Sequence, residues 1–72
     1  MEWSGGDDDK SCIIGDYTLR AEQMDKDRFW WNVSFKGVEV YSDALTEKFA
    51  KTMSKAQYYC VYHKIMHEKT NK

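Results

Sequence analysis

The chain has 72 residues and a formal net charge of -1, with 42% hydrophobic and 15% aromatic residues and no proline. This length excludes two domains and most enzymes that carry a substrate cleft of their own. The nearly balanced charge argues against a nucleic-acid or membrane binder that relies on electrostatics alone, because such proteins usually carry a clear basic excess.

The sequence has no apolar run near the roughly 20 residues that a membrane-spanning helix needs. Its start, Met1-Glu2-Trp3, lacks the basic and apolar regions of a signal peptide. We therefore expect a cytoplasmic protein, of its own cell or of a host cell, that makes no membrane contact. In that compartment Cys12 and Cys60 are expected to stay reduced.

The first eleven residues contain two adjacent glycines and a run of three aspartates, with Trp3 as their one aromatic residue. This composition lacks the apolar density that offsets the entropy lost when a chain is ordered. We predict a mobile acidic tail over residues 1–11, followed by a single α+β domain over residues 12–72.

Residues 17–41 show the period-two alternation of β-strands. A two-residue turn at Lys36-Gly37 pairs Phe35 with Val38 and Val33 with Val40, which keeps these apolar residues on one face. The preceding hairpin needs an odd loop of three or five residues, with or without an added bulge, to bring Leu19 and Ala21 to that face. The pattern therefore predicts a three-stranded antiparallel meander.

Ser42 and Asp43 supply an N-cap and a first-turn acid for a helix. Apolar residues follow at helical spacing, namely Leu45, Phe49, Met53, Ala56 and Cys60. This stripe is expected to cover the apolar sheet face, which gives a βββα order. For residues 57–66 two interpretations stay open: the helix continues, as the lack of a turn residue favours, or a fourth strand forms. A continuous helix is apolar on two sides, which suits a homodimer through this C-terminal helix.

The C-x2-H-x3-H spacing of Cys60, His63 and His67 places three metal-binding side chains on one side of a helix, and Cys12 is a candidate fourth zinc ligand. The favoured interpretation is that Cys60 packs as a small hydrophobic residue beside half-exposed histidines. No second close-spaced ligand pair is present, so we expect no metal and no cofactor.

The sequence contains no nucleophile elbow, phosphate-binding glycine loop or signature carboxylate pair, and we expect no enzymatic activity. The open face of the predicted sheet is more informative. It carries Trp30 and Asn32, and it places Tyr41 opposite Asn32 and Arg20 beside Trp30. Because Trp, Tyr and Arg are enriched at binding hot spots, these four residues form the candidate partner-binding surface. A second interpretation stays open, in which residues 11–15, with the apolar run Cys12-Ile13-Ile14, cover Trp30.

The predicted helix also carries basic and aromatic side chains on its outer side, namely Lys48, Lys51, Lys55, Tyr58 and Tyr62. Such a mixture is typical of nucleic-acid-binding faces, although lysines on an amphipathic helix also simply solvate it. A small nucleic-acid-binding module is therefore the alternative hypothesis.

The plan of residues 17–56 combines the aromatic strand Arg28-Phe29-Trp30-Trp31, a short turn and a capped helix. In this respect the chain resembles many compact viral and prophage proteins that inhibit host machinery. The resemblance implies a small protein-binding regulator of inhibitor type, whose partner is a larger protein.

Overall fold

The computed structural model describes residues 2–70 of the chain. These residues form strands β1 (Ser4–Gly5), β2 (Asp9–Ile14), β3 (Tyr17–Asp25), β4 (Arg28–Phe35) and β5 (Val38–Ser42), and helices α1 (Asp43–Thr46) and α2 (Met53–Thr70). Residue 1 of the predicted tail and residues 71–72 of the predicted domain lie outside the described residues.

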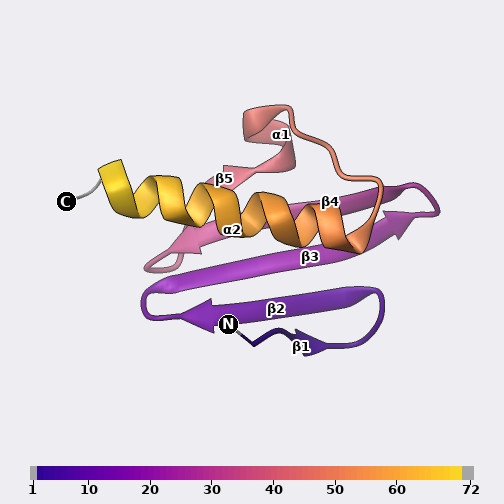
Figure 1. Cartoon of the computed structure of the whole chain (residues 1–72), viewed down its shortest axis with the longest axis horizontal. Coiled ribbons are helices and arrows are strands. Elements are labelled where there is room, and N and C mark those ends of the chain that lie inside the picture. Colours follow the sequence, from indigo (N-terminus) through magenta and orange to yellow (C-terminus); the bar gives the residue numbers. More distant parts are fainter. Residues whose placement is uncertain (1, 71–72) are drawn as a thin grey trace.

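The strands form one antiparallel sheet in the order β1-β2-β3-β4-β5, and α2 lies along one face of it over β3 and β4 (Figure 1). The short helix α1 contacts β5 and β4. The predicted α+β class is confirmed, and the predicted meander corresponds to β3, β4 and β5 of a larger, five-stranded sheet. We call the sheet face away from α2 the open face.

The segment before Cys12 belongs to the sheet, which corrects the prediction of a tail over residues 1–11. Strand β2 pairs with β3 from Asp9 opposite Glu22 to Ile14 opposite Tyr17. Trp3 is half-buried against the core. Main-chain pairing holds these polar residues in place, so the segment is ordered without an apolar side chain at every second position.

The β3–β4 hairpin places Leu19 opposite Val33 and Ala21 opposite Trp31, which confirms their predicted common face. The predicted loop length of three or five residues is wrong, because Asp25 pairs with Arg28 across a two-residue turn. A bulge between Gln23 and Asp25 restores the alternation of the strand.

The Lys36-Gly37 turn is confirmed, since Phe35 pairs with Val38. Both turn residues have positive φ, 52° and 82°, as type I′ hairpin turns require. The predicted pairing of Val33 with Val40 is wrong. Ser34 pairs with Glu39 and Val33 pairs with Tyr41, so Val40 is the extra residue of a bulge and Tyr41 moves to the α2 side.

The predicted cap at Ser42 is confirmed, because its Oγ accepts a hydrogen bond of 3.1 Å from the Leu45 amide. The helix that it starts ends at Thr46, because the next residue, Glu47, is left-handed with a φ of 59°, and α2 begins only at Met53. The prediction of one continuous helix starting at Ser42 is therefore wrong. Leu45 and Phe49, which were expected to cover the sheet, are 65% and 59% exposed.

Helix α2 runs unbroken through residues 57–66, as the favoured interpretation expected. The alternative interpretation was right that the sheet has more than three strands, but the extra strands are β1 and β2. None of the helices within residues 2–70 combines the length and the apolar character needed to cross a bilayer.

The core lies between α2 and strands β2 to β4, with Leu19, Trp31, Val33 and Cys60 fully buried. The Trp31 Nε1 group donates a hydrogen bond of 2.8 Å to the Lys48 carbonyl oxygen. The Phe29 amide donates one of 2.9 Å to the Ala50 carbonyl oxygen. These two bonds fix the path of the α1–α2 loop beside β4, and this loop completes the candidate site.

Candidate functional site

Trp30 lies on the open face, because alternation along β4 turns its neighbour Trp31 into the core. The indole is half-buried, and the Arg20 guanidinium lies 5.8 Å from its ring centroid. A cation at this distance over an indole is favourable, which fixes the two side chains against each other. Arg20 is opposite Asn32, so the structure brings three of the four predicted partner-binding residues together.

The Asn32 side chain is held beside Arg20 and Trp30 by Glu39. The Asn32 Nδ2 group donates a hydrogen bond of 2.9 Å to the Glu39 carboxylate. Its Oδ1 is buried and has no hydrogen-bond partner among the described residues. Asn32 lies opposite Ser42 on β5, where the sequence predicted Tyr41.

Tyr41 is not part of the open face, and this corrects the predicted aromatic patch. The bulge at Val40 turns Tyr41 toward α2, where its ring centroid lies 5.0 Å from that of His63 and 6.1 Å from that of His67. Tyr41 thus packs under the helix as a structural residue.

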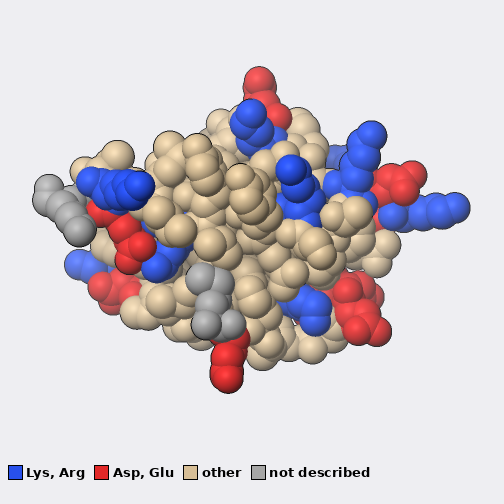
Figure 2. All heavy atoms as spheres, in the orientation of Figure 1, with Lys and Arg blue, Asp and Glu red and all other residues tan. Residues whose placement is uncertain are grey.

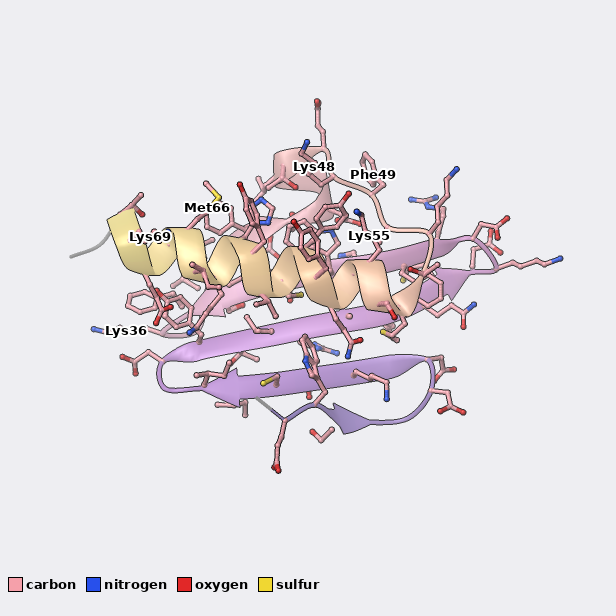
Figure 3. The ribbon with its side chains drawn as sticks, viewed as in Figure 1. Lys36, Lys48, Phe49, Lys55, Met66 and Lys69 are labelled. Atoms are coloured by element: carbon pink, nitrogen blue, oxygen red, sulfur yellow. The ribbon has the colours of Figure 1, made fainter. Side chains whose placement is uncertain are left out.

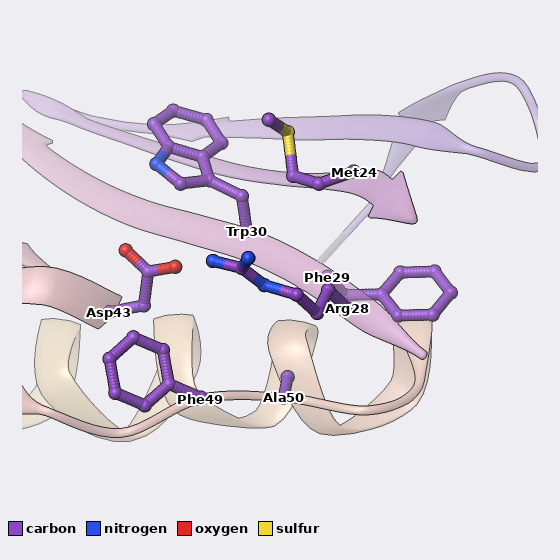
Figure 4. Close-up of a pocket in the computed structure, with 7 residues that line it drawn as sticks. All are labelled: Met24, Arg28, Phe29, Trp30, Asp43, Phe49 and Ala50. Atoms are coloured by element: carbon purple, nitrogen blue, oxygen red, sulfur yellow. The ribbon is translucent and has the colours of Figure 1, made fainter. Parts of the chain in front are cut away.

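A shallow pocket of about 70 Å³ opens next to Trp30 (Figure 4). It is lined by the ends of β3 and β4, by α1 and by the α1–α2 loop, through Met24, Arg28, Phe29, Trp30, Asp43, Phe49 and Ala50. We call these residues the Trp30 pocket. Sequence reasoning missed all of them except Trp30, because the loop that carries Phe49 and Ala50 reaches β4 only through the bonds described above.

The chemistry of the Trp30 pocket is mixed. In Figure 4 the Arg28 guanidinium points toward the Asp43 carboxylate, with the indole of Trp30 on one side and the ring of Phe49 on the other. Asp43 is 9% exposed, and its Oδ1 accepts a hydrogen bond of 2.7 Å from the Ala44 amide.

The size of the pocket sets what it can hold. It is far smaller than the roughly 300–1,000 Å³ of typical small-molecule pockets. Its volume suits one side chain of another protein, with an apolar body against the rings and a polar tip near the two charges.

Three of the four predicted zinc-ligand candidates have other partners. His63 Nδ1 is 2.8 Å from the Tyr59 carbonyl oxygen, and His67 Nδ1 is 2.7 Å from the Tyr17 hydroxyl. Cys60 Sγ donates to the Arg20 carbonyl oxygen at 3.3 Å.

Burial raises the pKa of the Cys60 thiol to about 12, so it stays protonated, whereas a metal ligand must be a thiolate. Cys12 is also buried and free. Within residues 2–70 no group of three or more His, Cys, Asp or Glu residues is placed to hold a metal ion.

The five residues of the predicted nucleic-acid face separate into two groups. Lys48 and Lys51 lie on the α1–α2 loop, whereas Lys55, Tyr58 and Tyr62 lie on α2. Lys55 Nζ is 5.1 Å from the Tyr58 ring centroid, and the Tyr58 and Tyr62 rings stack with centroids 6.1 Å apart. Figure 3 shows Lys48 and Phe49 above the helix and Lys55 at its N-terminal part.

Neither a protein-family model, nor a curated protein, nor a solved structure matches this chain. The resemblance to viral and prophage inhibitors therefore stays a prediction.

Proposed function

We propose that the protein is a small non-enzymatic regulator that docks on a larger protein through Trp30 and the open face around it, and inhibits that partner. The observation that supports this most is the half-buried Trp30 indole, which has a cation over its ring and a pocket of side-chain size beside it. Tryptophan and arginine are the residue types that most often dominate binding energy at interfaces.

The surroundings of Trp30 also suit a protein interface. The exposed residues Arg20 and Glu39 form a charged rim, while Trp30 and the exposed Met24 supply an apolar centre. An apolar centre inside a polar rim is the usual composition of interfaces between proteins that also exist apart. The partner is expected to insert one side chain into the Trp30 pocket.

Partner capture from a cell lysate, with and without nuclease treatment, tests this proposal. Wild-type protein is expected to retain a protein partner after nuclease, and Trp30→Ala is expected to lose it. Lys51→Glu is the matched control, because Lys51 is exposed on the loop and does not line the pocket. Loss of all bound material on nuclease treatment contradicts the proposal.

The alternative is a nucleic-acid-binding module on α2. Its support is the contact of Lys55 with Tyr58 and the stacking of Tyr58 on Tyr62, since aromatic platforms next to cations bind single strands. Such a module is expected to bind oligonucleotides with a steep salt dependence, and Lys55→Glu is expected to weaken that binding.

A further inference from the structure

The outer side of α2, away from the sheet, carries a stripe of exposed apolar residues. Tyr58, Tyr62, Ile65 and Met66 are between 37% and 54% exposed. Counted from Tyr58, the other three follow at four, seven and eight residues, which places all four on one side of the helix. Ala56, Cys60 and His63 lie on the side that faces the core. Figure 2 shows a broad uncharged surface on this side of the molecule. We call the four residues the α2 outer stripe.

Two lysines bracket the α2 outer stripe. Lys55 precedes it by three residues and Lys69 follows it by three, and Figure 3 shows them toward the two ends of the helix with Met66 between them. The single acidic residue of α2, Glu68, forms an ion pair of 2.9 Å with Lys64. The stripe therefore has a lysine near each end, and within residues 2–70 neither lysine forms an ion pair with a carboxylate.

This basic end of the chain contrasts with the rest of it. Residues 48–72 carry six lysines and one acidic residue, whereas residues 1–47 carry eleven acidic residues against five lysines and arginines. The net charge of -1 conceals this separation. An anionic partner is attracted to α2 and repelled by the net negative charge of residues 1–47, so the field of the protein orients its approach.

We propose that the α2 outer stripe binds an amphipathic helix of another protein, in which carboxylates bracket an apolar stripe. Apolar side chains at intervals of four and seven residues match the ridges and grooves by which helices pack. Burying them displaces water from four exposed side chains, and carboxylates at both ends of the partner helix meet Lys55 and Lys69.

A second copy of the chain fits this surface less well. In an antiparallel pair of α2 helices, Lys55 lies beside Lys69 of the other copy, and in a parallel pair each lysine lies beside its own equivalent. Both arrangements set like charges together at both ends of the contact. An acidic partner removes this repulsion, which makes the heterologous contact the favoured one.

A nucleic acid also fits less well. Half of the stripe, Ile65 and Met66, is aliphatic and has no ring on which a base stacks. Lys55 already lies 5.1 Å and 5.3 Å from the Tyr58 and Tyr59 ring centroids, and the net negative charge of residues 1–47 repels a phosphate backbone. An acidic helix needs only the apolar stripe and the two cations at its ends.

The test is an NMR titration of the full chain with two synthetic helical peptides. Both carry leucines at i, i+4 and i+7; one has glutamates at both ends and the other has lysines there. The glutamate peptide is expected to shift amide signals of residues 55–69 and to bind at least tenfold more tightly than the lysine peptide. Lys55→Glu combined with Lys69→Glu is expected to reverse this preference.

Tyr62→Lys is expected to weaken binding of the glutamate peptide at least tenfold, with a melting curve as the check on folding. Ile65→Lys gives the same test if the first variant lowers the melting temperature. Trp30→Ala is expected to leave peptide binding unchanged, because Trp30 lies on the open face. Equal affinity for both peptides, shifts confined to other elements, tighter binding of an oligothymidylate, or self-association that Tyr62→Lys abolishes overturns the proposal.

Discussion

The ring of Tyr41 lies 5.0 Å from the imidazole of His63, and His63 in turn stacks at 5.0 Å on the buried indole of Trp31. Tyr41 therefore belongs to a layer of rings between α2 and the sheet. The bulge at Val40 turns Tyr41 to the α2 side of the sheet, whereas Trp30 lies on the open face. The two aromatic residues have different roles as a result.

Tyr41→Ala is expected to lower the free energy of unfolding by about 2–4 kcal/mol, because it removes a ring from a packed layer. Tyr41→Phe keeps the ring and is expected to cost less than about 1 kcal/mol. Urea unfolding measures both values. Wild-type stability of Tyr41→Ala, together with loss of partner binding, contradicts the assignment of Tyr41 to the core.

The core depends on Trp31, which is fully buried, and hardly at all on Phe49, which is 59% exposed. Trp31→Ala is expected to cost about 3–5 kcal/mol, a large share of the stability of so small a domain. Phe49→Ala is expected to cost less than about 1 kcal/mol. Calorimetric melting of the two variants distinguishes them, and equal costs would mean that Phe49 packs inside.

Much of the meander could be predicted from the sequence. The alternation of residues 29–35 and the Lys36-Gly37 turn point to the same inner face, and the turn residues have the positive φ that such turns require. The Ser42 cap could also be predicted, because a serine hydroxyl followed by an acidic residue is typical of the start of a helix.

The differences arise where main-chain geometry acts without a side-chain signal. The bulge at Val40 adds one residue to an alternating strand and reverses the face of Tyr41. Glu47 ends α1 in a left-handed conformation that usually calls for glycine or asparagine. Only the first half of strand β2 is polar, and the Gly15-Asp16 pair between Ile14 and Tyr17 is a hairpin signal that sequence reasoning could have used.

The candidate site was predictable only in part, for a related reason. Alternation along β3 and β4 places Arg20, Trp30 and Asn32 on one face. Phe49 joins Trp30 because the α1–α2 loop is fixed by the bond from Trp31 Nε1 to the Lys48 carbonyl oxygen, a contact over 17 positions that no local pattern encodes.

The buried thiol of Cys60 predicts a dependence on pH. Burial raises its pKa to about 12, whereas an unfolded cysteine has a pKa of about 8.5. The unfolded chain therefore loses this proton first, and the free energy of unfolding is expected to fall as the pH rises from about 9 toward 12.

Urea midpoints at pH 7, 9 and 10 test this effect by comparison with Cys60→Ala, because burial also raises the pKa of Tyr17 and adds a loss of the same sign. The variant is expected to lose less stability than the wild type over this range. In the native protein the thiol is also expected to react slowly with Ellman's reagent. Rapid reaction without denaturant contradicts the burial of Cys60.

We place the partner on the open face at Trp30, and paired binding and melting curves test this placement most directly. The partner captured with the wild-type protein is titrated with Trp30→Ala, with Met24→Lys, which fills the mouth of the pocket from an exposed position, and with Lys51→Glu as control. We predict that Trp30→Ala costs more than about 2 kcal/mol of binding, or roughly 30-fold in affinity, in a protein that still melts cooperatively. Met24→Lys is expected to weaken binding in the same direction, and Lys51→Glu to change little. The opposite result is wild-type affinity for Trp30→Ala and Met24→Lys together with loss of binding for Lys51→Glu. It would contradict binding at Trp30 and would place the partner-binding surface on the helix side of the protein.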